Sequence, residues 1–351
     1  MNKKLIAIAV AASFAAPMAV QAEATPYANV QFEVFDFDDG KTKAAGSDSG
    51  MYVGDRERGR VGLKGSEDLG GGMKAIAMVE FDFVGGNDDS EFGDASDTDS
   101  AGDTVKVRGN GLRVREIMAG IKAGFGEIQI GTLKSAYKYT GGVKYDPFVT
   151  TTLEARGDYG MSGGTKGHNG FLNNMLAYKN KFGALSVWAT YSPDETDRDG
   201  DGNADDGELT YAVKFSSGNI EAFVSGYDGA FSDSTKEYSS NKIGGKFKLG
   251  GGTAVLAQYE LADSAGKDIT NTFVGFHFGM GKNTLVAQYG IQDKDEAVDT
   301  NDSGTMLTVG AVHKFSKKAR VFVGYKQVDG DAAGAAAKDE TTTSIGLRVD
   351  I

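Results

Sequence analysis

Residues 27–37, YANVQFEVFDF, alternate between apolar and polar side chains. The apolar row holds Ala28, Val30, Phe32 and Val34, and the polar row holds Asn29, Gln31 and Glu33. Successive side chains of a β-strand point to opposite faces, so a period of two residues predicts a strand with one apolar and one polar face. The same alternation returns along the chain, most clearly in residues 255–261, 285–291, 321–325 and 345–351.

The connections between these stretches are of two kinds, which follow one another in turn. Seven are short and rich in Gly, Ser and Lys, at residues 66–72, 124–126, 179–183, 216–219, 250–252, 279–282 and 316–318. Eight are longer and polar, near residues 38–50, 84–110, 134–170, 193–207, 229–239, 263–269, 293–304 and 329–340. These connections join sixteen strands, and short turns at one end with long loops at the other are typical of an outer-membrane barrel.

The sequence therefore predicts an all-β fold, a 16-stranded antiparallel transmembrane β-barrel with short periplasmic turns and long external loops. In such a barrel the apolar face contacts lipid and the polar face lines a water-filled lumen. The alternative is a large soluble β protein with aromatic side chains in its core. The regular alternation of short and long connections favours the barrel, because a soluble sandwich has no reason to separate them.

The N-terminus and the composition narrow the class further. Residues 1–22 have the parts of an export signal, with Lys3 and Lys4, an apolar core and the small-residue site Val20-Gln21-Ala22. We expect residues 23–351 to form one barrel domain whose formal charge becomes about −14, from −12, because the signal holds two lysines and no acid. This acidity disfavours nucleic acid as a partner. The absence of cysteine excludes disulfides and thiolate metal sites.

The connection at residues 134–170 lacks a clear period. Loops of that length are usually either functional or disordered. Because stretches typical of barrel walls precede and follow it, we expect this loop to fold into the barrel and narrow its lumen.

Two motifs and the C-terminus carry a resemblance to a known family. Residues 60–70, RVGLKGSEDLG, residues 115–127, REIMAGIKAGFGE, and the alternating apolar ending resemble the general, non-specific porins of Gram-negative bacteria, of the Neisseria and Comamonas type. The resemblance implies a sixteen-stranded barrel, normally a homotrimer, set among outer-membrane lipids and lipopolysaccharide, with a third long loop folded inward. The chain departs from that family in ending on Ile351 where such porins usually end in Phe.

Candidate constriction residues follow from strand parity and from the inward loop. Arg58 and Arg60 have the parity opposite to Val61, and Arg113 and Arg115 flank Val114, so all four arginines are expected to point into the lumen. Arg320 and Arg348 are further lumen candidates, and the inward loop offers Glu154 and Asp158, with Asp146 as a third acid. The predicted constriction consists of Arg58, Arg60, Arg113, Arg115, Glu154 and Asp158.

The family resemblance matches Arg60 and Arg115 to the basic cluster of the porin constriction and places the loop carboxylates opposite. A transverse field of this kind would orient polar solutes and sort ions by charge. The alternative is that the arginines only solvate a polar inner face. The sequence leaves the ion preference open, because acidic loops attract cations while the arginines favour anions.

Residues 197–208, DRDGDGNADDGE, match the spacing of a twelve-residue calcium loop. The predicted oxygen ligands are Asp197, Asp199, Asp201, Asn203, Asp205 and Glu208. The usual flanking helices are replaced by stretches that read as strands, so we expect weak Ca²⁺ binding in an external loop, with a dissociation constant on the order of 10⁻⁴ to 10⁻³ M. A solvated acidic loop is the alternative.

The predicted function is that of an outer-membrane porin, a passive diffusion channel for ions and small hydrophilic solutes that requires no cofactor. A substrate-selective channel, a barrel enzyme and a structural barrel are the alternatives. The pattern Gly160-Met-Ser162-Gly-Gly164, with His168 nearby, matches a nucleophile elbow. That chemistry needs a strand, a strained turn and a helix, which the sequence does not predict there, so we expect no enzymatic activity.

Overall fold

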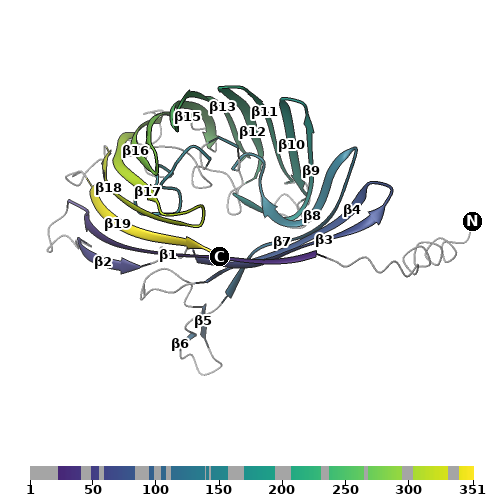
Figure 1. Ribbon diagram of the computed structural model, residues 1–351. Coiled ribbons are helices and arrows are strands. Elements are labelled where there is room, and N and C mark those ends of the chain that lie inside the picture. Colours follow the sequence, from purple (N-terminus) through teal and green to yellow (C-terminus); the bar gives the residue numbers. More distant parts are fainter. Residues whose placement is uncertain are drawn as a thin grey trace, which may run out of the picture.

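The computed structural model describes residues 23–40, 49–54, 59–83, 95–98, 104–107, 112–138, 140–141, 144–156, 170–193, 207–230, 237–264, 268–294, 303–330 and 340–351. The predicted export signal, residues 1–22, lies outside these ranges. Within them the chain consists mainly of antiparallel strands (Figure 1). No helix among the described residues is long and apolar enough to cross a membrane.

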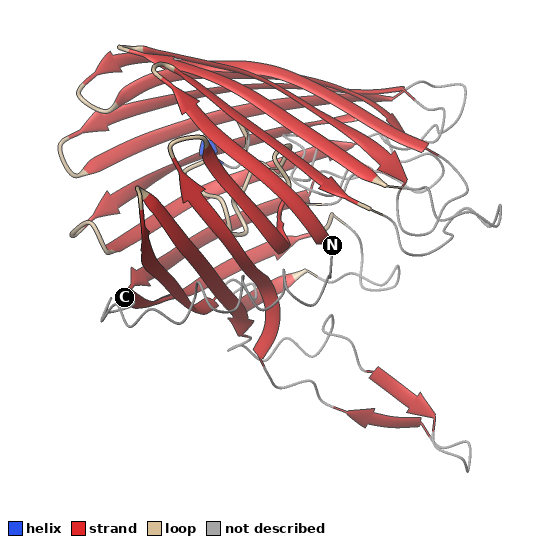
Figure 2. Ribbon diagram, turned by 90° about the vertical axis from the view of Figure 1, so that its right-hand side faces the viewer, coloured by secondary structure: helices blue, strands red, loops and turns tan. Residues whose placement is uncertain are grey.

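The strands follow the chain in order around a closed wall (Figures 1 and 2). They are β1 (Glu23–Asp38), β2 (Gly50–Gly54), β3 (Gly59–Gly70), β4 (Met73–Phe83), β7 (Leu112–Ala123), β8 (Gly126–Lys134), β9 (Phe171–Phe182), β10 (Leu185–Ser192), β11 (Glu208–Ser217), β12 (Ile220–Ala230), β13 (Glu237–Gly250), β14 (Thr253–Ser264), β15 (Asp268–Met280), β16 (Asn283–Lys294), β17 (Gly304–Lys314), β18 (Ala319–Gly330) and β19 (Glu340–Asp350). Strands β5 (Ala95–Thr98) and β6 (Thr104–Val107) form a separate two-stranded sheet that is not part of the wall.

The wall closes where the first strand meets the last. Strand β1 pairs with β19 in a register that sets Phe32 against Leu347. On its other edge β1 pairs with both β2 and β3, which are therefore two parts of one wall strand. With these two parts counted together, the 17-stranded sheet is a closed 16-stranded barrel, which confirms the predicted fold.

The seven predicted turns join consecutive strands at one end of the barrel (Figure 2). Several of them depend on glycine, because the backbone there is left-handed, with φ of 60° at Gly183 and 56° at Gly218. Such a conformation costs little only without a Cβ. The long connections leave from the opposite end.

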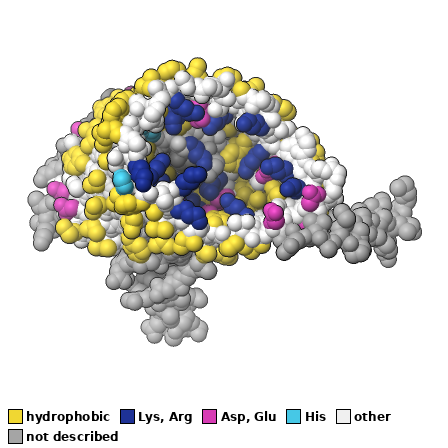
Figure 3. Space-filling model, in the orientation of Figure 1, with side chains coloured by type: hydrophobic (Ala, Val, Ile, Leu, Met, Phe, Trp, Pro, Cys, Tyr) yellow, Lys and Arg dark blue, Asp and Glu magenta, His cyan; other side chains and the backbone are white. Residues whose placement is uncertain are grey.

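The two faces of the wall differ as the alternation predicts. Phe32 is 43% exposed on the outside, whereas its neighbour Gln31 is 1% exposed on the inside. Large apolar side chains cover the outer surface (Figure 3). This arrangement inverts that of a soluble barrel and fits an outer face that contacts lipid and an inner face that contacts water.

Candidate functional site: the lumen and its inward loop

The connection between β8 and β9 folds into the lumen, and its described parts are residues 135–138, 140–141, 144–156 and 170. Near its start, the Ala136 amide donates to Thr210 Oγ1 on β11 at 2.9 Å, and the Tyr137 hydroxyl donates to Glu260 on β14. Farther along, Thr308 Oγ1 on β17 donates to the Leu153 carbonyl at 3.4 Å. The loop is therefore fixed to wall strands that lie far apart in the sequence.

Apolar side chains of the loop pack on apolar patches of the inner wall. In one cluster Tyr145 and Ala155 contact the inner faces of β12, β14, β15, β17 and β18; these wall residues are Phe223, Leu256, Phe273, Met306 and Val328. In a second cluster Phe148 and Leu153 contact Val286, Val312 and Phe322. Phe148 and Leu153 are fully buried. An apolar patch in a water-filled lumen is unfavourable unless something covers it, and here the loop does.

Two wall glycines give this loop its space. A Cβ at Gly310 on β17 would lie 2.8 Å from Phe148 Cζ, and a Cβ at Gly324 on β18 would lie 2.8 Å from Leu153 Cδ1. Both separations are shorter than real Cβ contacts, and each Cβ would also lie too close to the adjacent strand, 2.4 Å from the Val323 carbonyl oxygen and 2.7 Å from the Val309 carbonyl oxygen, so a larger residue would disturb both the wall and the docked loop. The wall sequence is therefore matched to the docked loop.

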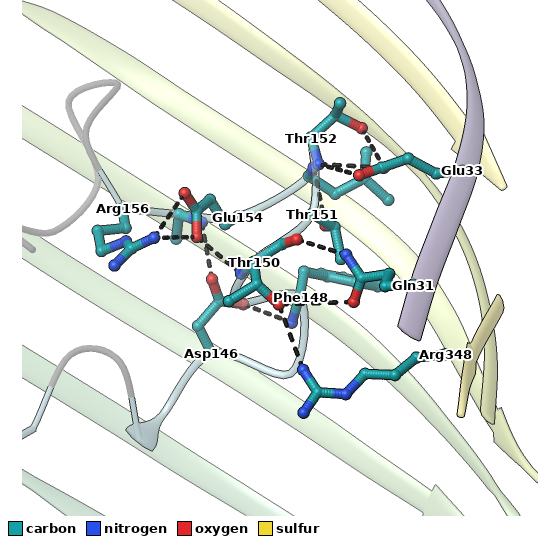
Figure 4. Close-up of polar contacts among 12 residues, drawn as sticks. Gln31, Glu33, Asp146, Phe148, Thr150, Thr151, Thr152, Glu154, Arg156 and Arg348 are labelled. Carbon is teal, nitrogen blue, oxygen red and sulfur yellow. Dashed lines mark hydrogen bonds and ion pairs between the residues drawn. The ribbon is translucent and has the colours of Figure 1, made fainter. Parts of the chain in front are cut away.

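Polar contacts fix the loop across the seam where the barrel closes (Figure 4). The Glu33 carboxylate on β1 accepts hydrogen bonds from the Thr152 amide at 3.1 Å, from Thr152 Oγ1 at 2.7 Å and from Ser344 Oγ on β19 at 2.8 Å. Beside it, Gln31 Nε2 donates to the Thr150 carbonyl, and Arg348 donates to Thr150 Oγ1 at 3.4 Å. One short segment thus bridges the first and last strands.

Thr150 has a φ of 75°, a conformation that is strained for a β-branched residue. The surrounding hydrogen bonds hold it there. Its amide donates to Glu154 Oε2 at 2.8 Å, and its carbonyl and hydroxyl oxygens accept from Gln31 and Arg348. Hydrogen bonds to the wall and within the loop therefore hold the tip in this conformation.

The two described acids of the loop, Glu154 and Asp146, accept most of their hydrogen bonds from the loop itself. Glu154 pairs with Arg156 at 2.9 Å and is only 9% exposed. Asp146 accepts from the Phe148 and Ala155 amides, both at 2.8 Å, and from Gln288 Nε2 on β16 at 2.9 Å. Asp158, the other predicted loop acid, lies outside the described residues. Within the described part of the loop, the acids serve to hold its shape.

Burial raises the pKa of Asp146 from 3.8 to about 6, and the charge of Glu154 adds to the rise, while the three N–H donors oppose it. In a loop released into water the pKa would return to its ordinary value. The docked loop therefore binds the proton more tightly, so docking is strengthened as pH falls from about 6 toward about 4 and weakened as pH rises through about 6.

Open-channel current noise, which reports transient loop release, is accordingly expected to decrease on acidification through this window. The control is the variant Asp146→Asn, whose side chain is neutral at every pH. Its current noise should not change with pH in this window. An identical pH profile in this variant and in the unchanged chain would assign the effect to another group.

The arginines Arg60 and Arg115 belong to an ion-pair network on neighbouring strands. Arg60 Nε lies 3.6 Å from Asp82 on β4, and Arg115 lies 3.0 Å from both Glu80 and Asp82. The guanidinium of Arg115 also lies 4.6 Å from the ring centroid of Phe171. The two arginines do reach the inside, yet each is compensated on its own side of the lumen.

The register between β4 and β7 corrects the parity argument for Arg115. The pairing shifts between Glu80 and Phe81, so that Glu80 opposes Glu116 and Phe81 opposes Val114. Arg115 is the extra residue of a β-bulge, and simple alternation from Arg113 does not place it. Arg113 pairs with Asp82 through its backbone, while its side chain and the whole of Arg58 lie outside what the structure describes.

Arg320 and Arg348 stand directly opposite each other on β18 and β19. Like charges at paired positions are destabilising, and the only ion pair of Arg348 in the described chain is with Asp350, at 2.9 Å. From β18 through β19, β1 and β3 to β7, arginines thus line one sector of the inner wall. The carboxylates Glu80 and Asp82 were missed as site residues, although their parity on β4 places them in the lumen.

Of the six predicted calcium ligands, Glu208 alone is described; the others, Asp197, Asp199, Asp201, Asn203 and Asp205, lie outside the described residues. Glu208 begins β11, is 3% exposed and shares the inward parity of Thr210. Across the described ranges no three His, Cys, Asp or Glu side chains form a group that could hold a metal ion.

Comparison with known proteins gives consistent matches over the whole chain. A profile of the family described as Gram-negative porin matches residues 7–333. The "Major outer membrane protein P.IB" of Neisseria meningitidis serogroup B is 24% identical over 384 residues, which covers 99% of each chain. The "Anion-selective porin from Comamonas acidovorans" has a similar structure, with a TM-score of 0.74 and 19% identity over 94% of this chain and 100% of that one. OmpT of Vibrio cholerae in its trimer form is also similar, with a TM-score of 0.63 and 17% identity over 94% and 99% of the two chains.

Proposed function

This chain belongs to the Gram-negative porin family, and we propose that it conducts anions in preference to cations. The sign of the charge in its lumen would decide this preference. The protein is an outer-membrane porin, a passive diffusion channel for ions and small hydrophilic solutes. Its relatives are channel proteins, and we propose that it likewise catalyses no reaction and requires no cofactor. Its outer face would contact membrane lipids and lipopolysaccharide, and residues 1–22 would direct its export.

Unequal access to charge supports the anion preference. The side chains of Arg348 and Arg60 are 17% and 14% exposed, whereas those of Asp82 and Glu116 are 4% and 6% exposed. Asp82 and Glu116 are each covered by a basic partner, Arg115 and Lys134, so these two acids are less accessible to a permeating ion than Arg60 and Arg348 are. Lys and Arg side chains accordingly gather in the hollow of the barrel (Figure 3). The Comamonas porin, which shares this fold, is described as anion-selective, in agreement with the proposal.

The predicted constriction follows in modified form. Arg60 and Arg115 would act together with Arg320 and Arg348 as the basic sector, and the loop tip at residues 150–154 would set the width. Glu154 would shape the loop through Arg156 and Thr150, more than it would form an opposing acidic wall. Reversal potentials across a KCl gradient test the preference: a value on the chloride side supports it, and a value on the potassium side contradicts it.

The protein would assemble as a homotrimer, as the family resemblance implies and as the trimer form of the Vibrio relative illustrates. The expected result is one detergent-solubilised species with about three times the mass of a single chain of residues 23–351, the full sequence of 351 residues having a mass of 36.9 kDa. Light scattering coupled to size exclusion measures this directly. A single species of one chain mass would contradict a trimer.

Weak Ca²⁺ binding at residues 197–208 also stays a proposal, supported by the ligand spacing. Calorimetric titration of the refolded barrel with Ca²⁺ is expected to give heat at millimolar concentrations, and Asp201→Ala should remove it. The variant Lys318→Ala, at a turn on the opposite end, is the matched control. Absence of heat in the unchanged chain would dispose of the site.

A further inference from the structure

Strands β3, β4 and β7 to β10 are neighbours in the wall and contribute no residue to the loop's two apolar clusters. They line a cavity of about 610 Å³ that opens into the lumen. This volume lies within the range of about 300 to 1,000 Å³ that is usual for small-molecule sites. The cavity is therefore large enough to hold a solute rather than only water.

The floor of this cavity is apolar, although a lumen wall should be polar. Five inward side chains form it: Ile76, Met78, Met118, Leu133 and Trp188. Met78 and Met118 are only partly buried and lie at the edge of the packed cluster of Leu133, Leu172, Met175 and Ala177. The loop's two apolar clusters cover such patches on other strands and include none of these five side chains.

The rim of the cavity carries an excess of positive charge, with four basic residues, Arg60, Lys64, Lys134 and Lys179, against two carboxylates, Glu80 and Glu116. Both carboxylates already have basic partners, Arg115 and Lys134. Lys64 Nζ lies 4.6 Å from the ring centroid of Tyr27 and has no ion pair in the described chain.

Lys179 joins the two features, because its Nζ lies 4.2 Å from the ring centroid of Trp188 and donates to Gln129 Oε1 at 2.9 Å. A cation thus stands directly beside the largest apolar surface of the cavity. A ligand that contacts both must have a negative group and an apolar body close together.

We propose that this cavity is a transit site for small organic anions, specifically carboxylates joined to an aromatic ring or a compact hydrocarbon. The carboxylate lies beside Lys179, Lys64 adds to the positive charge of the rim, and the apolar body lies on Trp188 and the two methionines. A cation would meet the excess of like charge, and an inorganic anion would leave the apolar floor wet. Binding is weak, since a solute in transit must also leave. The site rests on the proposed channel function and adds a substrate class to it.

The test uses single channels of the full barrel in planar bilayers, with KCl as the carrier and four probes of related shape. Benzoate is expected to reduce the chloride current at millimolar concentrations. Acetate lacks the body, benzyl alcohol lacks the charge and benzylammonium carries the opposite charge, so each should need a concentration about tenfold higher or more. Equal block by acetate and benzoate would overturn the proposal.

Three variants locate the site. Two of them should each raise the half-blocking concentration of benzoate about tenfold: the double variant Lys64→Gln with Lys179→Gln, and the single variant Trp188→Ala. Lys246→Gln on β13 also removes a basic residue from the barrel, outside the cavity lining, and should leave the block unchanged. Unitary current steps show that each variant has folded, and Lys64 is exposed, so its replacement does not threaten the barrel. An unchanged block in both site variants would contradict the assignment.

The reversal potential in the same recordings separates the two proposals. If the unchanged chain prefers potassium, while benzoate still blocks it and the site variants still weaken the block, only the proposed anion preference is contradicted. Chloride preference without selective benzoate block would remove the cavity site alone.

Discussion

Replacing Phe148 and Leu153 together by Ala is expected to release the inward loop and raise the single-channel conductance. Both side chains are fully buried against the wall. Truncating a buried Phe costs about 3–5 kcal/mol and a buried Leu about 2–5 kcal/mol, and a loop held partly by these contacts cannot absorb that loss. The strained Thr150 would then relax away from the seam, and the lumen would widen.

The matched control makes the same chemical change on the lipid face. Phe276 and Leu261 are 43% and 45% exposed there, so their replacement by Ala should leave conductance unaltered. Conductance and the size limit for neutral polymers would be measured for both variants. If the Phe148/Leu153 variant kept the unchanged values of both, the loop would not be what narrows the channel.

Replacing Arg60 and Arg115 by Gln is expected to shift the reversal potential toward cation preference. The change removes two positive charges and also leaves Glu80 and Asp82 without these partners. One unit charge about 10 Å from a permeating ion contributes about 0.4 kcal/mol in water and about 1.7 kcal/mol at an effective dielectric constant of about 20. Each charge lost should therefore change the permeability ratio by a factor between about 2 and about 17.

Two controls separate the local field from net charge and from misfolding. Lys317→Gln with Lys318→Gln removes the same charge from a turn and should have little effect, because salt screens exposed charges. A fourfold variant that adds Glu80→Gln and Asp82→Asn removes the whole network and should return the preference toward its original value. An unchanged reversal potential in the double variant would mean that these arginines do not face the ion path.

The wall could be predicted from the sequence because its determinants are local. Alternation in residues 27–37 sets which face contacts lipid, and glycines such as Gly183 and Gly218 fix turns that need a left-handed backbone. The register follows from these turns, so even the strand count could be read from them. The closure of β1 on β19 then follows from an even number of antiparallel strands.

The docking of the loop could not be predicted in the same way, because it depends on residues distant in the sequence. Phe148 meets Phe322, and Tyr145 meets Phe273, each pair separated by more than a hundred positions. One signal was available: the neighbours Phe223 and Val224 are both apolar, which breaks the alternation and marks an inner patch that something must cover.

The Arg115 bulge also left a trace. The outward residues Val114 and Ile117 are three positions apart, and an uninterrupted strand would separate them by an even number. By contrast, the pairing of Arg60 and Arg115 with Glu80 and Asp82 depends on side-chain geometry. The alternation of side chains along the strands could suggest that a basic wall faces an acidic wall. It could not show that Glu80 and Asp82 form ion pairs with arginines on the same side of the lumen.

The central claim is that the polar inner face encloses a continuous water-filled passage, narrowed by the inward loop. Single-channel recording of the purified protein in a planar bilayer of defined lipids tests it most directly. The expected result is stepwise insertion of channels with equal, ohmic current steps that scale with KCl concentration. Insertion into the bilayer without any current would contradict the claim.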